Sequence, residues 1–133
     1  MTAPEEDRTT DSGRRTKRVL IADHNRDWAD GLALLLEEQG YAVRTTYDGR
    51  EAIEAARTFQ PDIVVLDIRM PRLTGYEAAR VFHRHPQSTR PILVAITAWA
   101  GESGKLRAEM SGFDYYLAKP AEPAEILELL KNL

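Results

Sequence analysis

The sequence contains no cysteine, which excludes disulfide bonds, thiol catalysis and zinc sites built on thiolates. The remaining metal ligands are carboxylates, carbonyl oxygens and three histidines. No apolar run approaches the length of a membrane span, and the N-terminus lacks the basic and then hydrophobic order of a signal segment. We therefore expect a cytoplasmic protein that does not bind membranes.

The chain also lacks a large excess of either charge. Eighteen Lys and Arg stand against twenty-one Asp and Glu, which gives a formal net charge of -3. This balance gives no reason to expect direct binding to nucleic acid, so a local site must carry the function. At 133 residues with 43% hydrophobic content, the chain can form one domain with a substantial core.

The first sixteen residues differ in composition from the rest of the chain. Residues 1–16 contain almost no apolar side chains and many Thr, Asp, Glu and Arg residues. Such a segment cannot bury enough surface to offset the entropy lost on ordering. We expect a disordered tail over 1–16 and a folded domain over 17–133.

Short β-branched or apolar runs alternate with longer segments of helical period in the folded part. The predicted strands lie at residues 19–22, 41–46, 63–66, 92–96 and 115–118. This alternation is typical of βαβ units and a parallel sheet. It predicts an α/β, doubly wound, flavodoxin-like fold of five parallel strands in the order 2-1-3-4-5, with helices on both faces.

Five helices are expected between and after these strands. An apolar stripe predicts the first, which stops before Gly40 and contains Trp28, Leu32, Leu35 and Leu36. Capping-box spacing predicts where the second and third helices begin, at Asp48 with Glu51 and at Thr74 with Glu77. The fourth, between Glu102 and Met110, has few apolar residues, and the last starts near Pro123.

Four polar residues follow directly after predicted strands: Asp23, Asp67, Thr97 and Lys119. Each alone could be a helix cap, a turn residue or a solvated strand end. In a doubly wound sheet, however, the carboxyl ends of the strands meet at one edge, where ligands bind. Together these residues would supply a nucleophilic carboxylate, a second carboxylate for a cation, a hydroxyl donor and an ammonium group.

This set of groups suits phosphoryl transfer to a carboxylate. A carboxylate and a phosphoryl donor repel each other, so a cation must neutralise part of their charge, and Mg²⁺ accepts oxygen ligands and bridges phosphoryl oxygens. Asp67 would attack and become an acyl phosphate. Lys119 would then pair with the new charge, while Thr97 would donate a hydrogen bond to a phosphoryl oxygen.

From Lys17 to Leu133 the chain resembles the receiver domains of two-component response regulators. Four motifs carry the resemblance: VLIADHN at 19–25, PDIVVLDIRMP at 61–71 followed by Gly75, AIT at 95–97, and YLAKP at 116–120. The resemblance implies a phosphorelay protein that switches signalling rather than a conventional enzyme. At most, the chain would catalyse its own phosphorylation and dephosphorylation.

The resemblance also implies roles for individual residues. Asp67 would be phosphorylated by a histidine kinase or phosphotransfer protein, and Mg²⁺ would be held by Asp23, Asp67 and the backbone carbonyl of Arg69. Tyr116 would be the aromatic switch that turns inward as Thr97 moves. A downstream protein would then bind the surface formed by the helix at 102–110, the strand at 115–118 and the last helix. The Lys119–Pro120 peptide is expected to be cis.

One position departs from the family pattern. Receiver domains usually have two adjacent acidic residues after the first strand, and the second of these is His24 here. Neutral imidazole suits transition metals better than Mg²⁺. Three outcomes are open: Asp23 and Asp67 hold Mg²⁺ less tightly, His24 shifts the preference toward Mn²⁺ or a similar ion, or phosphorylation is weak or absent. The ring could also simply point to solvent.

Two other functions are alternatives to the phosphorylation switch. A pseudo-receiver would keep the fold as an interaction module with metal binding impaired by His24. An enzyme on a similar sheet could be a phosphohydrolase or a flavin protein. Such hydrolases carry a second Asp two residues after the nucleophile, where this chain has Arg69, and the flavin proteins need a Thr/Ser/Gly-rich loop where Asp23, His24 and Asn25 stand.

Overall fold

Five parallel strands form one sheet in a computed structural model that describes residues 16–70, 72–86, 89–98, 107 and 111–133. They are β1 (Arg18–Ala22), β2 (Ala42–Thr46), β3 (Ile63–Asp67), β4 (Ile92–Thr97) and β5 (Tyr115–Ala118). The order β2-β1-β3-β4-β5 confirms the predicted topology. It places β1 beside β3, where the order of the strands reverses.

The strand boundaries differ from the predicted ones by one residue at four places. β1 begins at Arg18 rather than at Val19. Tyr41 lies outside β2 because its N–H donates to the carbonyl of Leu36, 3.1 Å away, and so closes the preceding helix. Asp67 and Thr97 are the last residues of β3 and β4 rather than the first residues after them. Both strands extend because Asp67 pairs with Ile96 and Thr97 pairs with Ala118.

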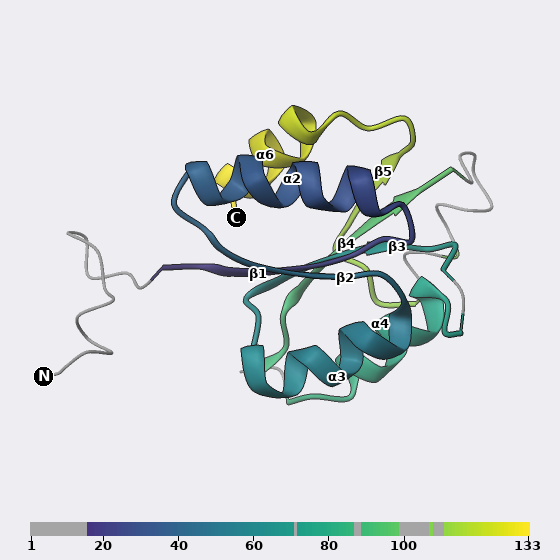
Figure 1. Ribbon diagram of the computed structural model, residues 1–133. Helices are drawn as coiled ribbons and strands as arrows, with labels where there is room; N and C mark the ends of the chain where they lie inside the picture. Colours follow the sequence, from purple (N-terminus) through teal and green to yellow (C-terminus); the bar gives the residue numbers. More distant parts are fainter. Residues whose placement is uncertain (1–15, 71, 87–88, 99–106, 108–110) are drawn as a thin grey trace, which may run out of the picture.

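Four helices are described, two on each face of the sheet (Figure 1). One face carries α2 (Arg26–Glu38) and α6 (Pro123–Lys131), and the other carries α3 (Gly49–Phe59) and α4 (Gly75–His83). None of these described helices is long and apolar enough to cross a membrane. The helix predicted at 102–110 lies outside the described residues except for residue 107, as do residues 1–15 of the predicted tail.

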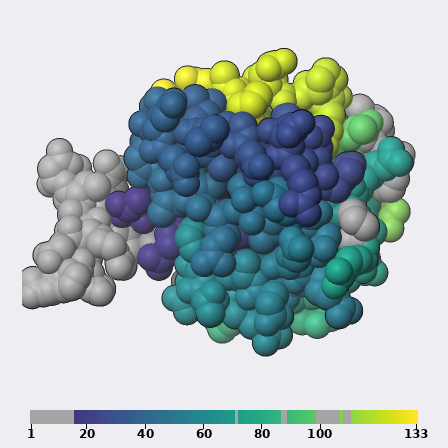
Figure 2. Space-filling view, viewed as in Figure 1, coloured from purple at the N-terminus to yellow at the C-terminus, as the bar shows by residue number. Residues whose placement is uncertain are grey.

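Alternating side chains of the strands build a core on each side of the sheet. In β1, Val19 and Ile21 point to the α2 and α6 face, whereas Leu20 and Ala22 point to the α3 and α4 face. All four are fully buried. Figure 2 shows the result at the surface, where α2 and α6 side chains cover one side of the molecule and α3 side chains cover the other. The sheet is therefore a middle layer that is buried on both faces and that positions the ends of its strands.

The two predicted capping boxes have different outcomes. Thr74 and Glu77 form the complete box at the start of α4, each accepting a backbone N–H from the other residue. Asp48 caps α3 by accepting the N–H of Glu51 at 2.8 Å, but the Glu51 carboxylate accepts the N–H of Tyr47 instead. The second box is therefore only half formed, because Glu51 reaches one residue further back along the chain.

Candidate functional site

The four polar residues predicted at the strand ends meet at the carboxyl edge of the sheet. Asp23 follows β1, Asp67 ends β3, Thr97 ends β4 and Lys119 follows β5. Since all the strands are parallel, these positions lie along the same edge. Asp23 and Asp67 come from the adjacent strands β1 and β3, so the two carboxylates lie close together at the switch point.

Lys119 links the two carboxylates. Its Nζ atom lies 3.2 Å from Oδ2 of Asp23 and 3.4 Å from Oδ2 of Asp67. Its backbone N–H also donates to the carbonyl of Thr97 at 2.7 Å, which ties it to the end of β4. The Lys119–Pro120 peptide is cis, as the resemblance implied. One ammonium group thus faces two carboxylates, which leaves a net negative charge in the site.

Backbone groups hold the other oxygen of each carboxylate. Oδ1 of Asp23 accepts the N–H of Asn25 at 2.8 Å, and Oδ1 of Asp67 accepts the N–H of Arg69 at 3.2 Å. Oδ2 of Asp23 is buried and has no aligned hydrogen bond, although it forms the ion pair with Lys119. A carboxylate oxygen has more than one lone pair, so this atom could accept a cation beside the ammonium group.

Burial raises the pKa of the Asp23 carboxyl above its usual value. The N–H of Asn25 opposes this shift, the charge of Asp67 adds to it, and the ammonium of Lys119 opposes it. The raised pKa means that the site disfavours the negatively charged form of the Asp23 carboxyl. A divalent cation beside the carboxylates would relieve this penalty.

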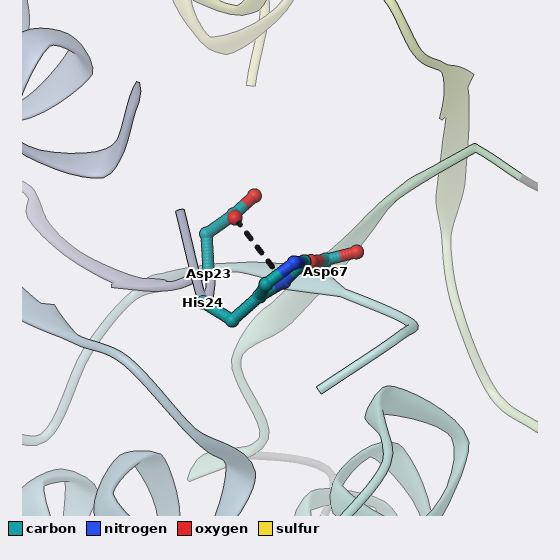
Figure 3. A group of neighbouring side chains, drawn as sticks. All are labelled: Asp23, His24 and Asp67. Carbon is teal, nitrogen blue, oxygen red and sulfur yellow. Dashed lines mark hydrogen bonds and ion pairs between the residues drawn. The ribbon is translucent and has the colours of Figure 1, made fainter. Parts of the chain in front are cut away.

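His24 turns into the site rather than simply toward solvent. Its Nδ1 atom lies 2.8 Å from Oδ2 of Asp67 and 3.8 Å from Oδ1 of Asp23, and Figure 3 shows the three side chains gathered together. The His24 side chain is 52% exposed, whereas both aspartates are almost fully buried. The ring therefore covers the outer side of the carboxylate pair.

The arrangement of these groups fits a divalent metal ion. One potential ligand atom from each of Asp23, His24 and Asp67 lies within 4.8 Å of the others. Two buried carboxylates would supply oxygen and charge, and the imidazole would supply nitrogen. Mg²⁺ prefers oxygen ligands, whereas imidazole nitrogen suits transition metals better, so this donor set is mixed.

The two predicted switch residues, Thr97 and Tyr116, lie in the adjacent strands β4 and β5. Their motion stays a prediction. Thr97 is completely buried at the end of β4. Tyr116 is half-buried in β5 and packs against the core on the α3 and α4 side. Burial, with a smaller contribution from Tyr76, raises the pKa of the Tyr116 hydroxyl.

Sequence reasoning missed two neighbours of the site. Asn25 is the N-cap of α2, since its side chain accepts the N–H of Trp28 at 3.1 Å. The spacing of these two residues could have predicted this cap. Trp28 donates its indole N–H to the carbonyl of Ala121 at 3.0 Å, and its ring centroid lies 5.8 Å from Nζ of Lys119. The apolar stripe assigned Trp28 only to the helix face.

The sequence is similar to a known protein family and to individual proteins. Residues 19–131 match the model of the response regulator receiver domain. The chain is 38% identical over 116 residues to response regulator MprA of Mycolicibacterium vanbaalenii, a match that covers 87% of this chain and 49% of that protein. It is 31% identical to an uncharacterised 14.6 kDa protein of Leptolyngbya boryana, covering 86% and 87% of the two chains. The chain thus spans about half the length of MprA.

Solved structures show the same arrangement of strands and helices. Chemotaxis response regulator CheY4 of Vibrio cholerae superposes with a TM-score of 0.81 at 26% identity, covering 88% of this chain and 98% of that one. A response regulator of Chloroflexus aurantiacus gives a TM-score of 0.80 at 31% identity, covering 89% and 97%. The similarity therefore extends over nearly the whole of the folded region.

Proposed function

The chain belongs to the response regulator receiver domain family, and on that premise we propose that Asp67 accepts a phosphoryl group from a histidine kinase or phosphotransfer protein. Receiver domains act in phosphorylation-dependent signalling and are not conventional enzymes. One observation carries the proposal: the Asp67 carboxylate is buried at the end of β3, 3.4 Å from the ammonium of Lys119 and beside a second carboxylate.

The residues of the site suggest how each step would proceed. An oxygen of the Asp67 carboxylate would attack phosphorus, and the bond from phosphorus to the donor's leaving atom would break with its electron pair. Lys119 neutralises the charge on the phosphoryl oxygens, and the Thr97 hydroxyl donates a hydrogen bond to one of them. Asp23, Asp67 and the carbonyl of Arg69 would hold a divalent cation, which would supply further charge neutralisation.

His24 lowers the affinity of this site for Mg²⁺ in the proposed scheme. A neutral imidazole replaces a negatively charged oxygen donor, so the electrostatic attraction for a hard cation is smaller. The buried carboxylates of Asp23 and Asp67 remain available. Phosphorylation is therefore proposed to need more Mg²⁺ than a site with two adjacent acidic residues.

The phosphorylated state would act by changing the surface near β5 and α6. Bonding of Thr97 to the phosphoryl group would draw it toward Asp67, and Tyr116 would follow into the space that Thr97 leaves. A phosphoryl group can shift an existing equilibrium between two surface arrangements, and a downstream protein would bind one of them more tightly. Part of this surface belongs to residues outside the described ranges.

Acetyl phosphate provides a test without a partner kinase. Incubation with saturating Mg²⁺ or Mn²⁺ is expected to increase the intact mass of the protein by one phosphoryl group. Removal of divalent cations with a chelator should suppress the increase, because the two anionic reactants would then repel each other. An unchanged mass at saturating concentrations of both ions would contradict the proposal.

A pseudo-receiver is the second candidate, and the 2.8 Å contact between His24 and Asp67 is the observation that favours it. A ring N–H that donates permanently to Asp67 would occupy the oxygen and keep cations away. This candidate predicts no phosphoryl transfer in wild type but transfer in His24→Ala. The same mass measurement on both proteins separates the two functions.

A further inference from the structure

We propose that His24 is a metal ligand through Nδ1 and that it shifts the preference of this site from Mg²⁺ toward divalent first-row transition ions. The inference deepens the proposed function, because the same carboxylates would hold the ion during phosphoryl transfer. Metal binding can nevertheless be measured without any phosphoryl donor. Its outcome is thus independent of whether Asp67 is phosphorylated.

The distances between the potential ligand atoms fit one coordination sphere. With metal–ligand bonds of about 2.1 Å, adjacent ligands of an octahedral ion lie about 3 Å apart and opposite ligands about 4.2 Å apart. Nδ1 of His24 lies 2.8 Å from Oδ2 of Asp67, close to the adjacent spacing. Its 3.8 Å separation from Oδ1 of Asp23 falls between the two values. Small side-chain adjustments therefore suffice to place all three around one ion (Figure 3).

The buried state of Asp23 is a second, independent indication of a cation. The residue is only 1% exposed, and its Oδ2 atom has no aligned hydrogen bond. Its nearest charged partner is Lys119, and that single ammonium group is shared with Asp67. Buried charges are normally paired or coordinate metals.

The chemistry of the donor set decides which cation is favoured. Mg²⁺ prefers oxygen ligands, whereas imidazole suits borderline ions and adds covalent character to their binding. Replacing a carboxylate by imidazole also removes one negative charge. This loss weakens the binding of Mg²⁺ more than that of transition ions, because Mg²⁺ binding is almost wholly electrostatic. Coordination needs the tautomer with the proton on Nε2, which the half-exposed ring can reach by exchange with solvent.

Isothermal titration calorimetry with Mg²⁺, Mn²⁺ and Co²⁺ tests the proposal on four proteins: wild type, His24→Ala, His24→Asp and His85→Asp. The last variant is a matched control, because it makes the same substitution at an exposed histidine beyond the end of α4. Transition ions bind many oxygen sites more tightly than Mg²⁺ does, so tight Co²⁺ binding alone does not show a nitrogen ligand. The decisive quantity is the ratio of Co²⁺ to Mg²⁺ affinity, compared between the four proteins. The visible absorption of bound Co²⁺ reports loss of the nitrogen ligand directly.

His24→Ala is expected to lower Co²⁺ affinity by at least about tenfold, since loss of even an outer-shell partner costs this much. His24→Asp should strengthen Mg²⁺ binding and reduce the Co²⁺ to Mg²⁺ ratio by at least about tenfold. His85→Asp should leave the ratio unchanged. If His24→Ala binds Co²⁺ as tightly as wild type or more tightly, the ring merely bonds to Asp67 and the proposal is overturned. These metal affinities are measured without a phosphoryl donor, so a failure of acetyl phosphate to modify the protein would not change them.

Discussion

Asp67→Asn is expected to abolish the incorporation of phosphate from acetyl phosphate. The amide has no anionic oxygen to attack phosphorus, and it also removes one of the two charges that would hold the cation. The amide oxygen can still accept the N–H of Arg69, which lies 3.2 Å from Oδ1 of Asp67 in the wild type. We therefore expect the free energy of unfolding to fall by no more than about 1 kcal/mol. Intact mass and urea unfolding measure the two effects separately.

Asp27→Asn is a matched control for this variant. Asp27 is an exposed carboxylate in the first turn of α2, and the same chemical change there leaves the site intact. It is expected to gain phosphate like the wild type. If Asp67→Asn gained phosphate at the wild-type rate, another side chain would be the acceptor.

Gly75→Ala is expected to destabilise the fold by about 1–3 kcal/mol, the usual cost of forcing extra atoms into a packed site. A Cβ atom on Gly75 would lie 2.6 Å from the carbonyl oxygen of Asp67 and 2.7 Å from Cα of Ile68. These are backbone atoms, so the start of α4 and the end of β3 would have to separate. The shift acts on the segment that carries Asp67, and phosphorylation should slow as well.

The same substitution at Gly31 should have the opposite sign. Gly31 lies inside α2, and a Cβ atom there would meet nothing within 4 Å. Replacing an interior helical glycine by alanine stabilises a helix by roughly 0.5–1 kcal/mol. Urea unfolding of both variants tests the contrast. Equal effects at the two positions would show that the close approach of Gly75 to Asp67 has no energetic consequence.

Much of the fold could be predicted because local pattern and topology agree. The apolar runs and the stripe over Trp28, Leu32 and Leu36 placed the strands and α2 nearly where they lie. Parallel strands then bring Asp23, Asp67 and Lys119 together whatever the details of the loops. The site was predictable at this level because it depends on where the strands end.

The remaining features depend on side-chain directions that spacing does not determine. Glu51 could reach Asp48 or Tyr47, and only the folded turn decides for Tyr47. Similarly, His24 could turn outward or toward Asp67, and the nearby buried charge favours the second direction. Trp28 contacts the segment after β5, which lies 93 residues further along the chain. No local pattern reports such a contact.

The most direct test of the central claim is to locate the phosphoryl group after reaction with acetyl phosphate. Borohydride reduces an acyl phosphate to an alcohol, so peptide mass spectrometry can identify the carboxylate that carried it. The account predicts a reduced side chain at position 67 and at no other carboxylate. Reduction at Asp23 or any other residue instead, or a phosphate that resists borohydride, would contradict it.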